Sequence, residues 1–302
     1  MSRINQKIAQ KYSELGENPE TYLEGLLHSK PINYWDYIEV ETLLSLQRPR
    51  TNFKDEEIFI MYHQMTELLL KMLLHEIKQL VETDSFSEEI WLDRINRMNR
   101  YVSMLITSFD IMKDGMDYED YNRFRTALAP ASGFQSAQFR YIEIYCTRLE
   151  NLVKQEEKKH LPGSPSIEDY FENIYWKEAG INKKTGNKTL TMLQFEEKYL
   201  DSLITLAKKV KGQSLEEKFL MLKKPSEALQ KKLLEFDKLY NIEWPLVHLN
   251  TAQHYLDKKG ENKAATGGSE WKEYLHPKFQ QRKFFPSLWT KEDSLEEEKI
   301  KI

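Results

Sequence analysis

An all-α fold is predicted by three features of the sequence. Leu, Glu and Lys, which favour helix, are abundant. Glycine and proline, which interrupt helices, are sparse, with 11 and 10 among 302 residues. Valine-rich alternating runs, the usual mark of β-strands, are absent. We therefore expect a single large helical domain over residues 1–302.

The composition also restricts the classes of partner. The formal net charge is −4, so there is no basic excess for nucleic acid, and no long run of one sign suggests a membrane surface. No stretch approaches the roughly 20 apolar residues of a membrane span, and the N-terminal residues lack the hydrophobic core of a signal peptide. Cys146 is the single cysteine, which excludes a disulfide within the chain and fits a reducing compartment. We expect a cytoplasmic protein.

Helical periodicity predicts the elements of the N-terminal half. The predicted helices cover residues 3–16, 19–27, 34–46, 55–83, 85–112 and 118–128. Residues 1–32 form an extension of the kind that packs on a partner subunit. Residues 55–83 carry the longest apolar stripe and include His63. Ser85 and Glu88 have the spacing of a capping box for the next helix.

A sharp break interrupts the helical pattern in the middle of the chain, within residues 121–140. Pro130 removes a backbone donor and disfavours helical geometry in the preceding residue. Gly133 adds backbone freedom, and Ser132 can cap the helix that resumes. Three arginines surround the break: Arg123, Arg125 and Arg140. Because paired N–H donors suit a carboxylate, the stretch is either a carboxylate grip or an ordinary helix–turn–helix corner.

The C-terminal half is predicted to be helical as well. The expected helices cover residues 132–159, 189–210, 214–224 and 226–257. Pro245 must kink the last of these. Residues 161–188 are predicted to be a loop or insertion that contains a short amphipathic segment at 167–181, and residues 291–302 a charged tail.

Two of the seven histidines stand on long, mostly apolar helices. His63 lies one turn after Phe59, and His248 lies one turn after Trp244. Each is either a core residue whose ring nitrogens are hydrogen-bonded within the protein or part of a site that the two histidines share. Residues 266–269, TGGS, either wrap an anionic group with backbone N–H donors or serve as a flexible linker. No Cys-x-x-Cys-His motif occurs, which excludes covalent c-type haem attachment.

Six motifs, in order along the chain, resemble those of the tryptophan 2,3-dioxygenase family. They are NYWDYIEVETLLSLQ at 33–47, FIMYHQMTELLLK at 59–71, FRTALAPASGFQSAQFR at 124–140, WPLVH at 244–248, ATGGS at 265–269 and FFPSLW at 284–289. Each alone is a weak signal, but six in the same order over most of the chain are highly specific.

The resemblance implies a role for each matching residue. His248 would be the axial ligand of a b-type haem, active as Fe(II), and His63 would lie over its opposite face as the catalytic histidine. Arg125 would hold the carboxylate of the amino acid, and Thr266 its ammonium or carboxylate end. The other substrate-binding residues would be Phe59, Tyr121 and Ser132, with Tyr34, Tyr37 and Ile38 reaching in from a neighbouring subunit. The loop glycines Gly267 and Gly268 would lie against the cofactor.

The implied activity is the first step of tryptophan catabolism by the kynurenine pathway. Both atoms of O2 would be inserted across the indole C2–C3 bond of L-tryptophan, which gives N-formylkynurenine. The resemblance also implies a homotetramer of haem-binding dioxygenase domains.

The sequence departs from the family pattern mainly in one loop, residues 257–271. Ala265 stands where glycine is usual, and Glu270 and Trp271 stand where small residues are usual. Leu69 replaces a customary tryptophan. Two alternatives therefore stay open. One is a related haem enzyme that oxidises or hydroxylates another aromatic amino acid, such as tyrosine, and the other is a non-catalytic haem-binding sensor.

Overall fold

The computed structural model of the chain describes residues 2–83, 86–182, 185–257 and 271–293. The chain divides into two compact units, residues 1–47 and residues 48–302. Among the described residues, no helix has the length and apolar character needed to cross a lipid bilayer. Extended pairing in the same residues is limited to isolated bridges, such as that of Val153 with Ile174. The prediction of an all-α protein is confirmed.

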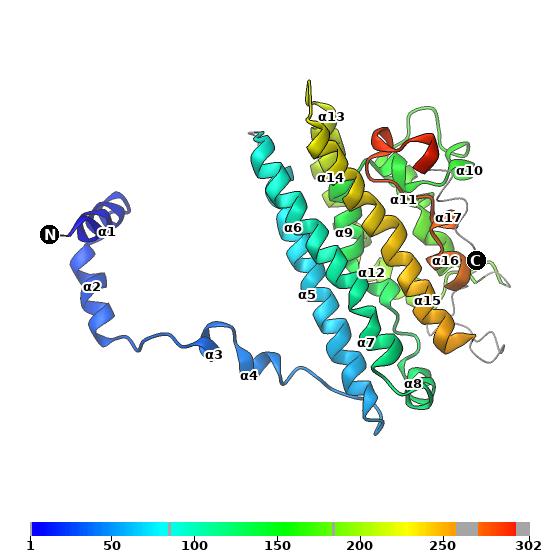
Figure 1. The fold of residues 1–302 in the computed structure, drawn as a ribbon, viewed down its shortest axis with the longest axis horizontal. Coiled ribbons are helices and arrows are strands. Elements are labelled where there is room, and N and C mark those ends of the chain that lie inside the picture. Colours follow the sequence, from blue (N-terminus) through cyan, green and yellow to red (C-terminus); the bar gives the residue numbers. More distant parts are fainter. Residues whose placement is uncertain (1, 84–85, 183–184, 258–270, 294–302) are drawn as a thin grey trace. The chain divides into compact units, whose positions relative to one another are not determined.

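The first unit consists of four short helices, in blue in Figure 1: α1 (Arg3–Glu14), α2 (Pro19–His28), α3 (Tyr34–Tyr37) and α4 (Val40–Leu43). The first two match the prediction. The predicted helix over residues 34–46 is wrong, because Glu39 adopts a left-handed conformation with φ of 54° and separates α3 from α4. No residue from 2 to 47 is buried, so this unit has no hydrophobic core of its own.

The second unit contains the remaining elements. Its α-helices are α5 (Asp55–Val81), α6 (Glu88–Thr107), α7 (Phe109–Asp114), α8 (Tyr118–Phe124), α9 (Ala137–Cys146), α10 (Gln155–Lys158), α11 (Ile167–Glu172), α12 (Leu190–Val210), α13 (Leu215–Leu220), α14 (Glu227–Lys238), α15 (Trp244–Leu256), α16 (Trp271–Leu275) and α17 (Pro277–Gln280). Short 3₁₀ helices are η1 (Arg125–Leu128), η2 (Gly133–Gln135), η3 (Leu149–Leu152), η4 (Tyr175–Gly180) and η6 (Pro286–Leu288), and η5 (Leu239–Glu243) is a π-helix.

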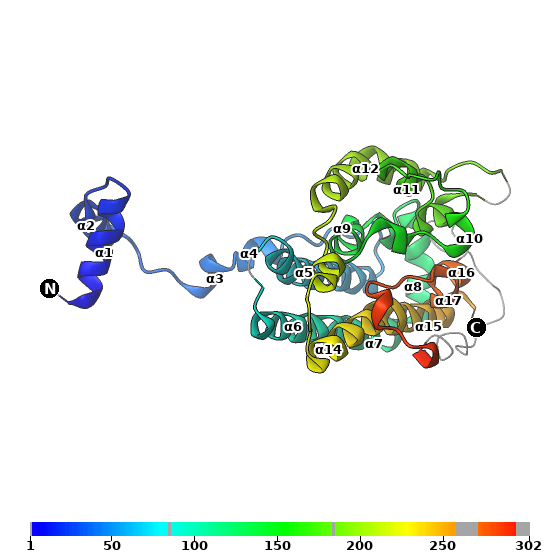
Figure 2. The same cartoon turned by 90° about the horizontal axis from the view of Figure 1, so that it is seen from above.

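The long helices of this unit pack side by side. Seen along their axes in Figure 2, α9 lies between α12 and α5, and α6 lies between α5 and α14. The faces that meet are fully buried, as in Leu73 and Ile77 of α5, Ile95 and Val102 of α6, and Leu233 of α14. This bundle fixes the positions of α5 and α15, which carry the two candidate histidines.

Two predicted helices are shorter than expected. The predicted helix at 85–112 begins at Glu88, with Ser87 as its N-cap, and is interrupted at Ser108. Ser85, the first residue of the predicted capping box, lies outside the described residues, and no side-chain hydrogen bond caps the helix at Ser87. The predicted helix at 132–159 is also wrong in extent, since α9 spans only Ala137–Cys146.

A distant carboxylate explains why α9 ends early. The buried side chain of Glu216 accepts hydrogen bonds from the Thr147 hydroxyl at 2.8 Å, from the Arg148 backbone and side chain, and from the Asn151 amide at 2.8 Å. These tertiary bonds hold the chain away from the path of α9: Thr147 and Arg148 are extended, and the chain then turns into η3. Glu216 is 69 residues away from Thr147 along the chain, so local periodicity could not reveal it.

Pro245 is accommodated by a π-helix. The five residues of η5 form a wider turn directly before Trp244, and α14 and α15 run on from its two ends. Proline has no N–H for the regular i to i−4 bond, and a π-turn is one of the ways in which a helix absorbs such a defect. The predicted irregularity at Pro245 is thus present, and it occurs one turn before His248.

The carboxylate of Asp237, at the end of α14, fastens the C-terminal segment to the bundle. It accepts hydrogen bonds from the backbone N–H groups of Phe284 at 3.0 Å and Phe285 at 2.8 Å, from the Trp289 indole at 2.8 Å and from the Asn241 amide at 2.7 Å. Burial raises the pKa of Asp237 above its usual value, although these donors act in the opposite direction.

We expect Asp237→Ala to destabilise the protein strongly. The change leaves four buried donors without an acceptor, and the loss in free energy of unfolding should be about 3 kcal/mol or more. Urea denaturation followed by circular dichroism measures it. Asp201→Ala, at an exposed position on α12, is the control and should change stability by less than about 0.5 kcal/mol. Equal effects of the two substitutions would contradict the role assigned to Asp237.

Candidate active site

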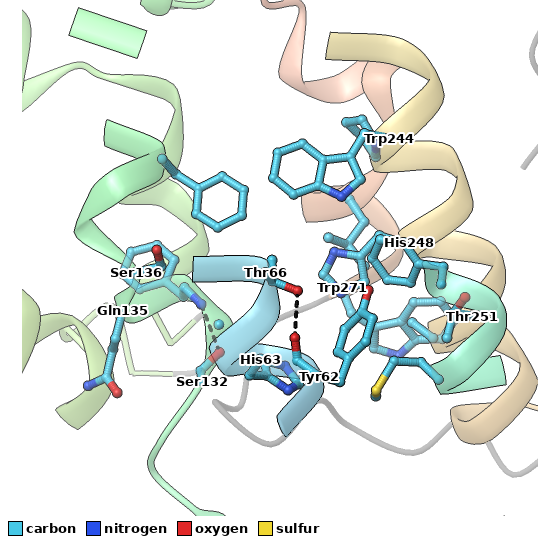
Figure 3. A pocket seen from close by; sticks show the side chains of 18 of the residues that line it. Tyr62, His63, Thr66, Ser132, Gln135, Ser136, Trp244, His248, Thr251 and Trp271 are labelled. Atoms are coloured by element: carbon cyan, nitrogen blue, oxygen red, sulfur yellow. Dashed lines mark hydrogen bonds between the residues drawn. The ribbon is translucent and has the colours of Figure 1, made fainter. Parts of the chain in front are cut away.

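A pocket of about 560 Å³ lies between α5, the break before α9, and α15. It is the region shown in Figure 3. Six residues singled out by the sequence line it: Phe59, His63, Tyr121, Arg125, Ser132 and His248. Their roles in binding and catalysis stay predictions, but the fold brings them together from four separate segments.

Six predicted site residues cannot be placed in this pocket. Thr266, Gly267 and Gly268 lie outside the described residues. Tyr34 and Tyr37 belong to the first unit, as does Ile38, and all three are exposed there. Their predicted contribution to a neighbouring subunit's pocket stays a prediction.

The imidazole of His63 has a defined tautomer. Its Nδ1 lies 2.8 Å from the backbone carbonyl oxygen of Phe59, one turn earlier on α5. Because a carbonyl only accepts, Nδ1 carries the proton and donates it, which leaves Nε2 as an acceptor. Burial lowers the pKa of His63, although the Phe59 carbonyl and the Glu67 carboxylate oppose the shift. The ring is therefore neutral at physiological pH and can accept a hydrogen bond from a ligand in the pocket.

The imidazole of His248 faces the same pocket from α15 (Figure 3). Burial lowers its pKa to about 4, and the nearby His63 adds to this shift. More than a third of the residue is accessible, but this surface opens into the pocket rather than onto the outer surface. Phe109 packs against the ring, with centroids 5.3 Å apart. Among the described residues, none forms a side-chain hydrogen bond with His248, so a ring nitrogen is available to a ligand.

Aromatic rings close the pocket beside His63. The Phe59 ring lies 4.1 Å from that of His63, and the Tyr121 ring lies 6.1 Å from Phe59 and 4.1 Å from Tyr255. The Tyr255 hydroxyl donates to the Met112 carbonyl at 2.5 Å, which ties α15 to α7. These flat apolar walls suit a planar ring system.

The break at Pro130 is held in place by α12. The Thr191 hydroxyl donates to the Pro130 carbonyl at 2.8 Å, and Ser132 caps η2 by accepting the Phe134 N–H at 3.3 Å. A Cβ built on Gly133 would meet no protein atom within 4 Å, and this glycine lines the pocket. The predicted cap at Ser132 is confirmed, and the break leaves room for a ligand to approach the backbone.

The three arginines predicted around the break divide between two places. Arg125 begins η1, is buried, and lines the pocket beside Tyr121. Arg140 also lines the pocket, on its α9 side. Arg123 does not line the pocket; its guanidinium lies 6.0 Å from the ring of Phe53. Of the three arginines, Arg125 and Arg140 are therefore the two that the pocket contains.

A second cluster of polar residues comes from α9, η4 and the C-terminal segment, and its members Arg140, Tyr175 and Arg282 line the pocket. Glu143 accepts hydrogen bonds from Arg140 at 3.1 Å and from Arg282 at 2.6 Å, and the Tyr175 hydroxyl donates to it at 2.6 Å. All four residues are buried. Their sequence separation gives no local signal, and the sequence did not reveal this cluster.

Three further pocket residues have a signal in the sequence, although none was predicted to be a site residue. Tyr255 follows His248 by seven residues on α15, the spacing of one helical face. Glu67 follows His63 by four residues, and the Gln138 amide holds it by donating to its carboxylate at 2.7 Å. Trp271, one of the departures from the family pattern, is buried and lines the pocket beside Thr251 (Figure 3).

The residues present fit a b-type haem. The pocket has two neutral imidazoles on separate helices, α5 and α15, a mostly aromatic and aliphatic lining, and a size typical of a cofactor site. A neutral imidazole is a good axial ligand for haem iron. His248, with no side-chain partner among the described residues, would serve as that ligand, and His63 would remain on the opposite side.

The two depressed histidine pKa values give a pH prediction for the haem-free chain. Below about pH 6.5 the unfolded chain takes up protons that folded His248 resists until about pH 4. Stability should therefore fall as the pH falls through this window, and His248→Gln should make the fall shallower. Melting temperatures measured between pH 7.5 and 4.5 (about the range where histidine titrates) test this. His160→Gln, at an exposed position, is the control; identical slopes in all three proteins would contradict the prediction.

Comparison with known proteins gives a consistent result. A family model described as tryptophan 2,3-dioxygenase matches residues 25–163. The chain is 28% identical to the tryptophan 2,3-dioxygenase of Bacillus thuringiensis subsp. konkukian over 290 residues, covering 91% of this chain and 98% of that protein. It is 26% identical to that of a Ruegeria species over 86% of this chain and 91% of that protein, and 27% identical to that of Geobacillus thermodenitrificans with the same coverage.

The match therefore extends over nearly the whole length of several relatives, and the part matched by the family model includes α5 and the break before α9. The chain is thus similar to tryptophan 2,3-dioxygenases over most of its length.

Proposed function

We propose that the protein is a haem-dependent dioxygenase that cleaves the indole C2–C3 bond of L-tryptophan with O2 to give N-formylkynurenine. Similarity to the tryptophan 2,3-dioxygenase family and the names of the relatives support the reaction. The observation that carries the proposal is that His63 of α5 and His248 of α15 line one aromatic pocket that also contains Arg125. A haem bound through His248 would supply the iron at which O2 reacts.

The residues of this chain then have distinct tasks. His63 presents an acceptor nitrogen, because its Nδ1 proton is committed to the Phe59 carbonyl. That nitrogen suits the indole N–H of tryptophan. Arg125 would bind the substrate carboxylate through paired donors. The aromatic walls at Phe59 and Tyr121 would orient the ring and exclude water.

The cofactor assignment predicts which histidine is essential. His248→Ala should abolish the Soret band of the purified protein, because the axial ligand is lost. His254→Ala is the matched control: it lies on the same helix, stacks edge-on against Tyr118 with centroids 6.1 Å apart, and does not line the pocket. It should retain the band. The reverse pattern would move the axial ligand to His254.

Substrate choice is the most direct test of the reaction. An indole N–H matches the acceptor on His63, whereas tyrosine places its hydroxyl at a different point, and one mismatch in a dry site costs about 1–3 kcal/mol. Tryptophan should therefore exceed tyrosine in kcat/KM by about tenfold or more. The reduced protein is mixed with O2 and each amino acid, and the absorbance of N-formylkynurenine is followed.

One observation favours the alternative of a different aromatic substrate. Trp271 is buried in the pocket wall, where the family pattern leads one to expect a small residue. Turnover of tyrosine without any product from tryptophan would establish that alternative. A spectral response to tryptophan without product from any amino acid would instead point to a sensor.

The first unit supports an oligomer, which we propose to be a homotetramer. Its apolar side chains are exposed, including Ile4 on α1, Leu15 at the C-cap of α1, Leu27 on α2, and Tyr34 and Tyr37 on α3. A segment of this size without a core is not stable alone. We propose that these residues are covered by another copy and that Tyr34, Tyr37 and Ile38 contribute to its pocket.

Deletion of residues 1–47 should disrupt both assembly and turnover. We expect light scattering to show a smaller particle and kcat/KM for tryptophan to fall by at least about a hundredfold, as for other losses of substrate-positioning groups. Deletion of residues 294–302 is the control and should preserve the oligomer. A monomer with full activity after deletion of residues 1–47 would refute the assignment. The predicted cytoplasmic location is a separate proposal that cell fractionation would test.

A further inference from the structure

The indole N–H of Trp244 is buried without a hydrogen-bond partner. Only 6% of the residue is exposed, it lines the pocket, and its Nε1 contacts no acceptor among the described residues. The ring is held firmly, because it stacks on Phe139 with centroids 4.7 Å apart and planes 11° from parallel. Figure 3 shows this indole on the same helix as His248, one turn earlier, with its nitrogen turned toward the pocket interior. A buried donor of this kind requires an explanation.

Arg282 supplies a second such donor from a different segment. It is 6% exposed and lines the pocket, and its Nε also has no hydrogen-bond partner among the residues that the structure describes. Its Nη1 is committed, since it donates to Glu143 at 2.6 Å and to the Tyr175 hydroxyl at 2.9 Å. Because the guanidinium is planar, these two bonds fix the direction of the remaining N–H groups.

The groups around Arg282 keep it charged. Burial alone would lower the pKa of Arg282, but Tyr175, Glu143 and Tyr240 together raise it above its usual value. The Tyr240 ring connects the two donors, since its centroid lies 5.9 Å from the Arg282 guanidinium and 5.1 Å from the Trp244 ring. A fixed cation and a fixed N–H donor thus lie in one wall of the pocket. Their natural ligand is an anionic acceptor with more than one oxygen.

We propose that Arg282 and Trp244 form a carboxylate-binding subsite of the pocket, separate from Arg125, that binds a propionate of haem. The inference rests on the proposed function, because haem b is the molecule that would bring propionate groups into this pocket. Glu143 and Tyr175 position Arg282, and Phe139 positions Trp244. The amino acid substrate is the other possible source of a carboxylate, and the experiment distinguishes the two.

The test compares haem with its dimethyl ester, which has the same iron and macrocycle but no carboxylates. Each is titrated into the haem-free full-length protein, and the Soret band gives the dissociation constant. The wild-type protein should bind haem more tightly than the ester. Arg282→Gln should reduce this preference by about tenfold, and Trp244→Phe, which keeps the stacked ring and removes only the N–H, by about threefold. Effects on His248 ligation cancel in the ratio of the two dissociation constants.

A matched control separates the subsite from general charge effects. Lys283→Gln removes a neighbouring cation that does not line the pocket and lies 4.4 Å from the Trp289 ring, and it should leave the preference unchanged. If Arg282→Gln fails to fold, Trp244→Phe still decides the question. An unchanged preference in both variants would overturn the proposal. If the KM for tryptophan rose at the same time, the subsite would belong to the amino acid instead.

The failure of this inference is distinguishable from failure of the proposed function. A wild-type protein without a Soret band would refute the haem-dependent function itself. A normal Soret band, together with the same preference for haem over its dimethyl ester in the wild type and all variants, would refute only the subsite. Arg125→Lys adds a positive control for the other carboxylate: it should raise the KM for tryptophan and leave the preference for haem over its ester unchanged.

Discussion

The buried carboxylate of Asp237 is the interaction on which the geometry of the α15 side of the pocket depends. Burial of a carboxylate is unfavourable, and this one is retained because four donors from two segments converge on it. The bonds join the end of α14 to the segment at 284–289, and η5 follows directly. Because η5 determines the direction of α15, the hydrogen bonds of Asp237 also help to fix the position of His248.

The helix type at residues 239–243 has a functional consequence. A regular helix turns through a fixed angle at each residue, so one wide turn rotates every later side chain relative to the bundle. Trp244, His248 and Tyr255 all lie after that turn, and all three line the pocket. Because Pro245 requires the wide turn, it determines which face of α15 lines the pocket. Stability and site geometry are set by the same local feature.

Sequence periodicity predicted the long helices well, because their apolar residues recur at the helical period. The neighbouring helices bury these same apolar faces, so the folded chain and the local pattern favour the same structure. It failed where a distant group decides the local structure, as when Glu216 holds residues 147–151 away from the α9 helix. The same division applies to the pocket. His63 and His248 stood out through their helices, and family motifs placed Arg125 and Ser132 with them. Glu143, Tyr175 and Arg282 meet only in the folded chain, and no spacing rule connects them.

Burial in the pocket has opposite consequences for the protonation of its histidines and its arginines. Burial lowers the pKa of both histidines, so each loses its proton and becomes an acceptor or ligand at neutral pH. Arginine cannot respond in this way, since its pKa lies far above any physiological pH. A buried guanidinium must therefore be accompanied by an anion, and Glu143 already serves two of them. One desolvated space thus contains neutral nitrogens, which suit a metal or an N–H donor, and permanent cations, which suit carboxylates. That division follows from the titration properties of the side chains, and it is the property on which the proposed pairing of a haem with a zwitterionic amino acid depends.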